Sequence, residues 1–241
     1  MIKKMNKNNS KKVFVRKIFD DVANKYDLMN DLMSIGLHRF WKKKFIEEIK
    51  LKNKKNKILD LGSGTGDIIF ELLKQKKMSN SQNQIILSDP NIKMMKESFK
   101  KFNDIKKIYC VANYGEELPF KNNQFDLITM SFSLRNTYNL KKTIREIHRV
   151  LKRNSQFLCL EFGEIDNPTI NQIYQIYSQN IIPKIGSFVT GNQEAYEYLI
   201  QSIKNFPKQK KLSNIFKQNG FKNVSFSNFA FGVVAIYSCN K

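Results

Sequence analysis

The chain of 241 residues contains few of the residue types that carry metal and redox chemistry, with 3 cysteines, 2 histidines and 1 tryptophan. Cys110, Cys159 and Cys239 lie far apart in apolar runs, and none forms a CxxC pair or neighbours a histidine. This spacing argues against a metal centre or a redox dithiol. It predicts reduced thiols that pack as small hydrophobic side chains.

Long apolar runs are missing as well, and none approaches the roughly 18 residues that a membrane span needs. The N-terminal run MIKKMNKNNSKK lacks the apolar segment of a secretory signal. We therefore expect an intracellular, cytoplasmic protein without transmembrane helices.

Arginine is scarce, because only 6 of the 42 basic residues are arginine, although the formal net charge is +21. The positive charge is concentrated in residues 1–57, net +11, and residues 136–241, net +8, whereas residues 58–135 carry only +2. Nucleic-acid binders usually rely on arginine for bidentate and stacking contacts. An excess of lysine together with asparagine and isoleucine is typical of drift in an AT-rich genome, so nucleic acid is disfavoured as a partner.

Short apolar runs alternate with helical patterns through the middle of the chain. This alternation predicts an α/β fold with a doubly wound, mostly parallel sheet covered on both faces. The last two expected strands form an antiparallel hairpin. The expected strands are Lys57–Leu61, Ile85–Ser88, Ile108–Ala112, Phe125–Ser131, Phe157–Phe162, Val224–Ser227 and Phe229–Ser238. Helices are expected at Val13–Ile49 with a break near Ser34–Gly36, Asp67–Lys77, Ile92–Phe102, Leu140–Lys152, Ile170–Ile182, Glu194–Ile203 and Leu212–Asn219.

The strongest local signal is a glycine-rich loop directly after an apolar strand, in the run ILDLGSGTGD. Its alternating glycines, Gly62, Gly64 and Gly66, predict a backbone that approaches a ligand closely at the start of a helix, and a structural turn is the alternative. A P-loop would need a following lysine, and a dinucleotide loop spaces its third glycine differently. Asp60 and Asp67 flank the loop and disfavour a pyrophosphate. They suit an ammonium and a sulfonium, which indicates S-adenosyl-L-methionine.

The next two strands end in residues that suit a nucleoside. Asp89 follows the second strand, where a carboxylate can accept hydrogen bonds from both ribose hydroxyls, and a helix N-cap is the alternative role. After the third strand, Tyr114 and Gly115 are placed to border adenine. The turn at residues 118–120 and Asp126 are expected to be structural.

Taken in order, these motifs resemble those of class I S-adenosylmethionine-dependent methyltransferases. The chain resembles more closely the ubiquinone/menaquinone-biosynthesis C-methyltransferases, from Val13 onward. Besides LDLGSGTGD, the resemblance rests on FDDVANKYDLMNDLMSIGLHRFWK, SFSLRNTYN, EIHRVLK, LEF, YSQNIIPKIG, YEYLIQSIKNFPKQ and NGFKNV. The first and last of these runs matter most, because generic methyltransferases lack them.

The resemblance implies a Rossmann-like, seven-stranded sheet with an N-terminal helical lid. We expect a disordered basic tail at residues 1–12, a helical lid and substrate segment at 13–50 and a methyltransferase domain at 51–241. Residues 163–206 are expected to form a helical insertion on the substrate side.

The resemblance also implies an activity, which is methylation of a ring carbon of a polyprenyl benzoquinol or naphthoquinol by S-adenosyl-L-methionine, without a metal. The residues that it places at the cofactor, together with those of the loop, are Asp60, Gly62, Gly64, Thr65, Gly66, Asp89, Tyr114, Gly115 and Ser131. We expect Arg135 to be the cation near the quinol oxygen, with Asn136 as its orienting partner. Because arginine stays protonated, a water or phenolate held by Arg135, Asn136 and Tyr26 is the expected proton acceptor.

The expected lipid tail needs an apolar groove, for which Phe40, Trp41, Phe45 and the Ile170–Ile182 helix are candidates. Arg39, Lys42, Lys43 and Lys44 could meet anionic lipid headgroups at an inner membrane, on the mitochondrial matrix face if the source is eukaryotic. His38 and His148 are expected to be structural. Other quinone-synthesis proteins and a second copy of the chain are further candidate partners. Two alternatives remain, a methyltransferase acting on another small molecule or on nucleic acid, and a non-catalytic scaffold.

Overall fold

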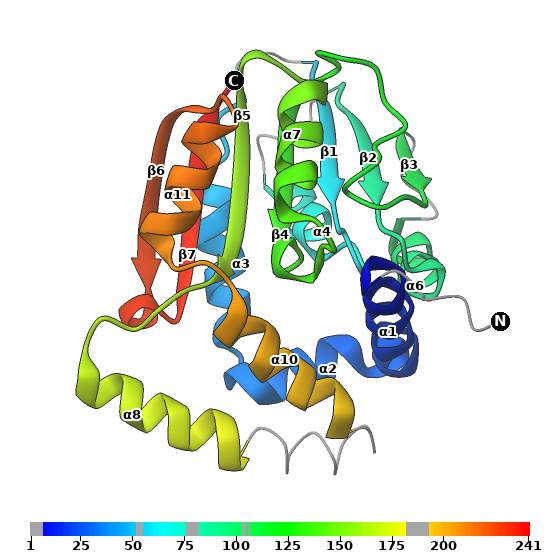
Figure 1. Ribbon diagram of the computed structural model, residues 1–241. Coiled ribbons are helices and arrows are strands. Elements are labelled where there is room, and N and C mark those ends of the chain that lie inside the picture. The colour runs from blue at the N-terminus through cyan, green and yellow to red at the C-terminus, as the bar shows by residue number, and fades with distance from the viewer. Residues whose placement is uncertain (1–6, 52–54, 76–81, 103–104, 106, 182–192) are drawn as a thin grey trace, which may run out of the picture.

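The computed structural model describes residues 7–51, 55–75, 82–102, 105, 107–181 and 193–241, with the side chains of residues 7–10, Asn24, Tyr26 and Gln179 outside the description. A seven-stranded sheet forms its centre (Figure 1), in the order β3-β2-β1-β4-β5-β7-β6. The strands are β1 (Lys57–Leu61), β2 (Gln84–Ser88), β3 (Ile108–Val111), β4 (Phe125–Ser131), β5 (Leu151–Phe162), β6 (Lys222–Phe229) and β7 (Val234–Asn240).

Each strand pairs in parallel with its neighbour in the series β3, β2, β1, β4 and β5. Strand β7 pairs antiparallel with both β5 and β6. The predicted fold class, a doubly wound and mostly parallel seven-stranded sheet with a C-terminal antiparallel hairpin, is therefore confirmed. The helices are α1 (Lys7–Val22), α2 (Tyr26–Ser34), α3 (Leu37–Glu47), α4 (Asp67–Leu73), α6 (Ile92–Phe102), α7 (Leu140–Val150), α8 (Pro168–Ile176), α10 (Gln193–Asn205) and α11 (Gln209–Gln218). Short helical turns are η1 (Ala23–Lys25), η2 (Leu134–Asn136), η3 (Tyr177–Ile181) and η4 (Ala230–Gly232). None of these described helices is long and apolar enough to cross a membrane.

Helices cover both faces of the sheet, which explains why its central strands are apolar throughout. Figure 1 shows α7 and α11 in front of the sheet and α3 and α4 behind it. Ile144 of α7 and Phe216 of α11 are fully buried in the front cluster, and Phe45 of α3 and Ile69 of α4 are fully buried in the rear one.

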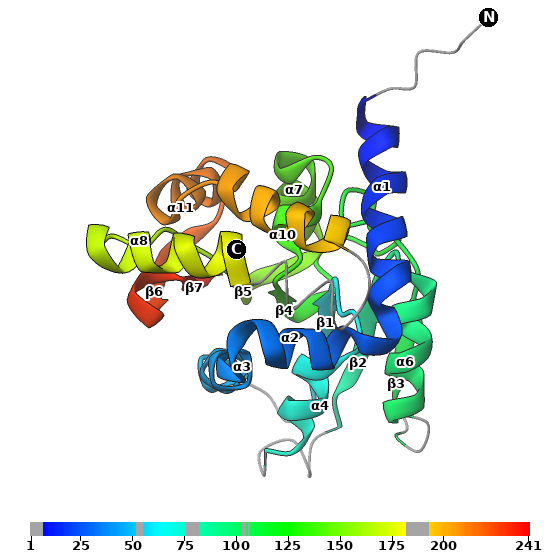
Figure 2. The same ribbon diagram turned by 90° about the horizontal axis from the view of Figure 1, so that it is seen from below.

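The direction of strand addition reverses between β1 and β4, because the chain runs from β1 outward to β3 and then returns to the other side of β1. In open α/β sheets, ligands bind beyond the carboxyl ends of the strands at this switch point. Figures 1 and 2 show α1, α2, α8 and α10 beneath that edge. The fold thus places the glycine loop after β1, and residues 132–136 after β4, beside these helices.

The predicted lid of residues 13–50 divides into two parts. Helices α1 and α2 pack against α10 through a small apolar cluster that includes Ile18, Met29 and Tyr196. Helix α3 instead belongs to the rear layer of the sheet, because its Trp41 and Phe45 are only 5% and 0% exposed. The covering element is therefore α1 and α2, and α3 is part of the main domain.

The expected disordered tail at residues 1–12 is wrong for residues 7–12, which already belong to α1. Contacts with residues distant in sequence, which the local pattern does not predict, hold residues 11 and 12 in place. Lys11 donates a hydrogen bond to the carbonyl of Thr137 over 2.7 Å, and the Lys12 ammonium lies 4.0 Å from the Tyr138 ring centroid. Residues 1–6 lie outside the described residues.

Two other boundaries differ from the sequence prediction. The helix predicted to end at Lys152 ends at Val150, because Leu151 already pairs with Phe125 as the first residue of β5. The register of β5 against β4 shifts after this pair, and Asn154 in the shifted stretch has a positive φ angle. The hairpin turn lies at Ala230–Gly232 and not at residue 228, since Phe229 still pairs with Val234.

Cys159 and Cys239 are buried as predicted, whereas Cys110 is exposed. The prediction of a packed thiol at Cys110 is wrong because β3, which carries it, is an edge strand.

Candidate active site

The glycine loop connects the buried strand β1 to the first turn of α4. Gly62, Gly64 and Gly66 all have positive φ angles, of 66°, 53° and 79°, which favour residues without a side chain. A Cβ atom at Gly62 would lie 2.3 Å from Ser133 Oγ, and one at Gly66 would lie 2.6 Å from the Phe102 ring. Around Gly64 the space is open, so Gly64 is the position at which a ligand can approach the backbone.

Asp60 lies near the end of β1 and is 1% exposed. One carboxylate oxygen accepts a hydrogen bond from Thr129 Oγ1 at 2.7 Å, and Oδ2 is buried without a partner in the described part of the chain. Burial raises the pKa of Asp60 to about 7, only partly opposed by the Thr129 hydroxyl. An orphaned carboxylate oxygen at a cavity wall fits the ammonium group of an amino-acid ligand.

Asp89 follows β2 and is held by two backbone amides. Gly64 donates to Oδ2 at 2.9 Å and Asn91 donates to Oδ1 at 2.7 Å. A carboxylate has about four acceptor sites, so two remain for a ligand such as a vicinal diol. Burial raises the pKa of Asp89 to about 6.

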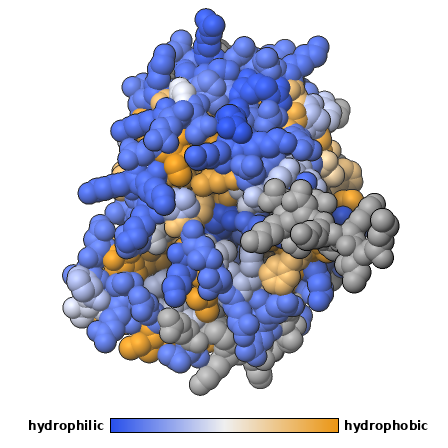
Figure 3. Space-filling view, in the orientation of Figure 1, coloured by the Kyte–Doolittle hydropathy of each residue, from blue (hydrophilic) through white to orange (hydrophobic). Residues whose placement is uncertain are grey.

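Two adjoining cavities open at this edge of the sheet, one of about 400 Å³ and one of about 120 Å³. Figure 3 shows a hydrophilic face with apolar side chains around a hollow between the sheet and the helices below it. The residues that line both cavities are Phe19, Gly62, Gly64, Ser131 and Phe132. Ser131 Oγ is buried there without a partner among the described residues.

Most of the predicted cofactor residues line these two cavities. The larger cavity includes Asp60, Gly62, Gly64, Thr65 and Ser131, and the smaller one includes Gly62, Gly64, Asp89, Tyr114, Gly115 and Ser131. Gly66 lines neither cavity and packs against Phe102 instead. Their arrangement fits S-adenosyl-L-methionine, because an unpaired acid, a diol acceptor and an aromatic wall follow one another along one path.

Helix α1 forms one wall of the smaller cavity, through residues that include Lys12 and Phe19. Tyr114 stacks edge-on against Tyr138, with ring centroids 6.1 Å apart. The Lys12 ammonium lies 4.6 Å and 4.0 Å from the two ring centroids. A cation over aromatic faces contributes about 0.5–1 kcal/mol at partly exposed sites, so Lys12 helps to hold α1 over this cavity.

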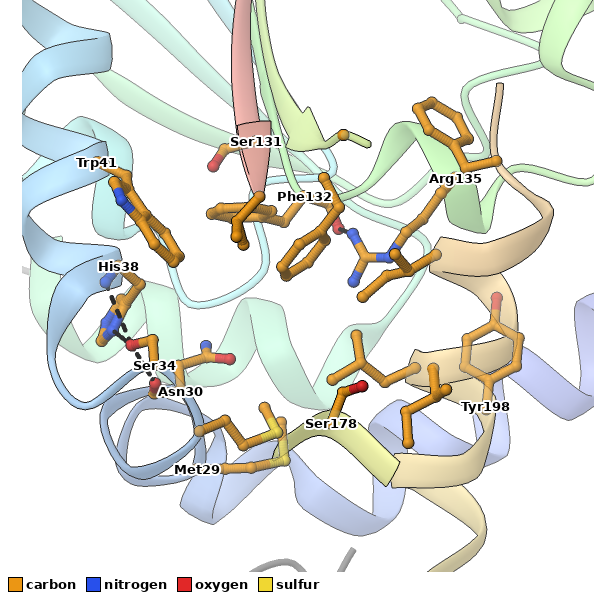
Figure 4. Close-up of a pocket in the computed structure, with 18 of the residues that line it drawn as sticks. Met29, Asn30, Ser34, His38, Trp41, Ser131, Phe132, Arg135, Ser178 and Tyr198 are labelled. Carbon is orange, nitrogen blue, oxygen red and sulfur yellow. Dashed lines mark hydrogen bonds between the residues drawn. The ribbon is translucent and has the colours of Figure 1, made fainter. Parts of the chain in front are cut away.

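Arg135 extends from η2 into the larger cavity (Figure 4). Its side chain is 6% exposed and pairs with the fully buried Glu161 of β5, with Nη1 and Oε2 separated by 3.1 Å. Glu161 also accepts a hydrogen bond from the Arg135 backbone amide at 3.1 Å, and Arg135 Nη1 donates to the Phe132 carbonyl. All the side-chain hydrogen bonds described for Arg135 use Nη1, so Nη2 remains for a ligand.

Asn136 lines the smaller cavity, whereas Arg135 lines the larger one. Within the described residues, no hydrogen bond joins the two side chains, so the orienting partner that the sequence suggested for Arg135 is Glu161 instead. Asn136 Nδ2 lies 3.4 Å from the Phe132 carbonyl, and Asn136 Oδ1 accepts a hydrogen bond from the Tyr198 hydroxyl at 3.1 Å.

A group of ion pairs fastens α2 to the glycine loop. Asp27 Oδ1 accepts a hydrogen bond from Thr65 at 3.0 Å, and Asp27 Oδ2 pairs with Lys101 of α6 at 2.9 Å. Lys101 and Lys42 both pair with Asp67, at 2.7 and 2.8 Å. Burial opposes ionisation, but the two lysines hold the pKa of Asp67 well below its usual range. Asp67 is thus neutralised by the protein, and Asp60 is the acid that remains for a cationic ligand.

His38 lines the far wall of the larger cavity beside Trp41 (Figure 4). Its Nδ1 lies 2.9 Å from Ser34 Oγ, and burial, reinforced by Lys42, lowers its pKa to about 4. A neutral imidazole that is hydrogen-bonded within the helical hairpin is consistent with the predicted structural role. His148 packs edge-on against Phe221, with ring centroids 5.1 Å apart.

The residues predicted to bind the lipid tail lie in different environments. Trp41 lines the larger cavity, but Phe45 is fully buried in the core and Phe40 is 51% exposed outside the cavity lining. The basic run beside them is largely paired: Arg39 binds Asp31, Lys42 is buried against Asp67 and Lys44 binds Glu47. The sequence suggested that Lys42 could meet a lipid headgroup, but its burial against Asp67 prevents this contact.

Sequence reasoning missed Glu161, Tyr174, Tyr198 and Lys101. The signal available for Glu161 was an acid within the apolar run FLCLEF, since a buried charge needs a partner. Tyr26, predicted to be catalytic, begins α2, and its side chain lies outside the described residues. The described residues hold no cluster of three or more histidine, cysteine or carboxylate side chains that could bind a metal.

The fold and the path of ligand-binding groups define a class I, S-adenosyl-L-methionine-dependent methyltransferase. A solved structure from Thermotoga maritima, described as a SAM-dependent methyltransferase and possible histamine N-methyltransferase, superposes with a TM-score of 0.63 at 16% identity. The match covers 94% of this chain and 99% of that one. At this identity the likeness shows the fold alone.

The family follows from the sequence comparisons. Residues 4–241 match the ubiE/COQ5 methyltransferase family, to which the chain belongs. The ubiquinone/menaquinone biosynthesis C-methyltransferase UbiE of Rickettsia bellii (strain OSU 85-389) is 43% identical over 98% of this chain and 95% of its own length. That of Rickettsia prowazekii (strain Madrid E) is 45% identical over 96% of this chain and 94% of its own length. The protein is therefore an S-adenosyl-L-methionine-dependent C-methyltransferase of this family.

Proposed function

We propose that this protein methylates a ring carbon of a polyprenyl quinol in ubiquinone or menaquinone biosynthesis. The substrate is a 2-methoxy-6-polyprenyl-1,4-benzoquinol, a demethylmenaquinol, or both. The observation that carries the proposal is a buried cation, Arg135, at the wall of a largely apolar cavity that adjoins the cofactor residues. A phenolic ring with an apolar tail is the chemistry that such a cavity accommodates.

The larger cavity provides both an apolar path and a polar end. Its apolar lining comes from α1, α2, α3 and α10, from the end of β5 and from the loops after β4, β5 and α10. The residues include Ile18, Phe19, Val22, Met29, Met33, Trp41, Phe132, Phe162, Ile165, Leu199, Ile200, Ile203 and Phe206. Near Arg135, the hydroxyls of Tyr174 and Tyr198 complete the polar end. Burial raises the pKa of Tyr174 to about 12, so its hydroxyl remains a neutral donor.

The bound cofactor supplies a methyl group that its sulfonium already activates. The protein's own contribution is alignment and ionisation of the quinol. Arg135 Nη2 binds a quinol oxygen and stabilises it as the phenolate, which raises electron density at the neighbouring ring carbon. The shared wall at Ser131 and Phe132 brings that carbon to the cofactor side, where alignment supplies much of the rate enhancement.

Proton balance requires an acceptor for the ring proton. Formation of the phenolate releases the hydroxyl proton to water. The ring carbon then gains a bond to the methyl group as the bond from sulfur to methyl breaks. It releases its own proton to restore aromaticity, and the quinol oxygen is reprotonated, so one proton leaves the site for each methyl group transferred. Arginine stays protonated, so in this proposal the acceptor of the ring proton is a water or the phenolate itself, held by Arg135, Asn136 and Tyr26. Glu161 stabilises the arginine and is fully enclosed.

The test is an assay with purified protein, cofactor and short-chain quinols of both ring classes, kept reduced under anaerobic conditions. We expect one methyl group to be added to ring carbon, detected by mass spectrometry and NMR, and Arg135→Met to reduce turnover by at least a hundredfold. Arg145→Met, on the exposed surface of α7, is the matched control and should retain turnover. If neither quinol is methylated while S-adenosylhomocysteine binds, another substrate class is correct.

We also propose that the α2–α3 turn and α8 contact a membrane in which the substrate is dissolved. Ile35 and Leu37 are 77% and 49% exposed, and Ile173 and Ile176 of α8 are 63% and 55% exposed. These helices lie on the side of the molecule that bears the cavity (Figures 1 and 2). Ile35 also has a φ of 51°, an unfavourable conformation for a β-branched side chain, so its exposure there calls for a binding role.

Ile35→Asn tests this contact with effects of opposite sign. Asparagine tolerates the left-handed conformation, so the free protein should be stabilised by about 1 kcal/mol. Flotation with anionic vesicles should weaken at the same time, because an exposed apolar anchor is lost. Val13→Asn, at an exposed position of α1, is the control for loss of an apolar side chain elsewhere. Unchanged flotation of the Ile35 variant would exclude this turn from the membrane contact.

A further inference from the structure

Tyr198 links α1 and α10, two helices that cover the cavity, to the turn η2, which carries Arg135 and Asn136. It lies on α10, and Figure 4 shows it below the loop from which Arg135 extends. Its hydroxyl donates a hydrogen bond to Asn136 Oδ1 over 3.1 Å. Its ring packs edge-on against Phe14 of α1, with centroids 5.7 Å apart. One side chain of α10 therefore contacts two segments, α1 and η2, that are distant from it in sequence.

The bond from Tyr198 determines which way the Asn136 amide faces. With Oδ1 accepting from Tyr198, Nδ2 is directed to the Phe132 carbonyl at 3.4 Å. The same carbonyl accepts a hydrogen bond from Arg135 Nη1. An asparagine without the hydroxyl partner can rotate its amide, which would present a donor where an acceptor now lies.

The chemistry of the hydroxyl suits this role. Tyr198 is largely enclosed between α1, α10 and the cavity, and burial raises its pKa above the usual value. The hydroxyl therefore remains a neutral donor at physiological pH. A donor is what the amide oxygen of Asn136 requires to keep its orientation.

We propose that Tyr198 is a positioning residue of methyl transfer, which fixes the Asn136 amide when α1 and α10 close over the cavity. The proposal rests on the proposed quinol methylation, because Asn136 helps there to hold the acceptor of the ring proton. It predicts that loss of the hydroxyl affects turnover more than substrate or cofactor binding. It also predicts that the effect requires Asn136.

The experiment compares Tyr198→Phe with Tyr177→Phe. Tyr177 is a matched control because its hydroxyl also joins two helical segments of the cover, donating to the Met33 carbonyl at 3.0 Å, but it does not contact Asn136. We expect Tyr198→Phe to lower kcat roughly five- to tenfold, the factor that a lost hydrogen bond produces. KM for the quinol and affinity for S-adenosylhomocysteine should change less than twofold, and Tyr177→Phe should retain kcat.

A second arm combines Tyr198→Phe with Asn136→Ala. If Tyr198 acts through Asn136, its removal should have no further effect on kcat in the Asn136→Ala background. Additive effects, equal losses in the two tyrosine variants or a wild-type kcat in Tyr198→Phe would each overturn the proposal.

A third arm does not depend on activity. The side-chain amide NMR signal of Asn136, assigned with Asn136→Ala, should shift or broaden in Tyr198→Phe and stay unchanged in Tyr177→Phe. An unchanged signal in both variants refutes the positioning role. Absence of quinol methylation by the wild type, with the NMR shift present, refutes the proposed substrate and leaves the positioning of Asn136 supported.

Discussion

The buried pair of Arg135 and Glu161 gives the sharpest prediction. The two side chains are 6% and 0% exposed, and Nη1 and Oε2 lie 3.1 Å apart. Glu161→Gln removes the negative charge but keeps an oxygen that can accept from the Arg135 backbone amide. The guanidinium is then buried without a counter-ion, for which the loss of stability is about 3–5 kcal/mol.

The structure places the expected value near the lower end of that range. The Phe132 carbonyl still accepts from Arg135, and the Phe162 ring centroid lies 5.0 Å from the guanidinium carbon. We therefore expect urea unfolding to show a loss of about 3 kcal/mol and thermal unfolding a drop of about 6–12 °C. The quinol kcat should fall as well, because the guanidinium is no longer held in one orientation.

A second substitution separates charge from packing. Arg135→Met in the Glu161→Gln background removes the unpaired cation, so the double variant should be more stable than Glu161→Gln alone, although it is inactive. Arg135→Met alone should also be destabilised, because it leaves Glu161 buried and unpaired. The argument is refuted if the two substitutions are additive in stability, or if Glu161→Gln unfolds within 1 kcal/mol of the wild type.

Three further predictions follow from the site. Because the pKa of Asp60 is raised to about 7 in the ligand-free protein, its ionisation should increase affinity for S-adenosylhomocysteine about tenfold from pH 6 to pH 8, with proton release in calorimetry, and Asp60→Asn should flatten this profile. The same raised pKa means that ionisation opposes folding, so this group's contribution to ligand-free stability is full below pH 3.8 and is lost as the pH rises through about 7. Gly62→Ala should destabilise the protein by about 3 kcal/mol because its Cβ would lie 2.3 Å from Ser133 Oγ, whereas Gly64→Ala should be milder in urea unfolding but should weaken cofactor binding. Lys101→Met should lower stability by about 1 kcal/mol and speed limited proteolysis of α1 and α2, because Lys101 bridges Asp27 and Asp67. Equal cleavage rates in the variant and the wild type would show that this bridge does not hold α2 in place.

The sequence predicted the parts of the site that follow from local pattern. The run ILDLGSGTGD combines a strand, a turn that requires positive φ and a helix start, so Gly62, Asp60 and their position followed from neighbouring residues alone. Asp89 was predictable for the same reason, since it ends the next apolar strand. These features depend on backbone conformation over a few residues, which composition and spacing express directly.

The partners of these residues were not predictable in the same way. Glu161 lies 26 positions from Arg135, Tyr198 lies 62 from Asn136 and Lys101 lies 74 from Asp27. Each contact depends on how helices pack over the sheet edge, and no local periodicity encodes that packing. The early start of α1 has the same origin, because Lys11 and Lys12 are held by the distant residues Thr137 and Tyr138.

The distribution of charge at the site matches the reaction that we propose. Methyl transfer from a sulfonium to a phenolate joins a cation and an anion into less charged products, and an apolar cavity favours such a change over the separated charges. A free guanidinium in that cavity would bind the phenolate strongly and make it a poorer nucleophile. Glu161 offsets part of the charge of Arg135, whose Nη1 it holds at 3.1 Å. The pair can therefore promote ionisation of the quinol without trapping the phenolate, and this requirement explains why an acid is fully buried within an apolar strand.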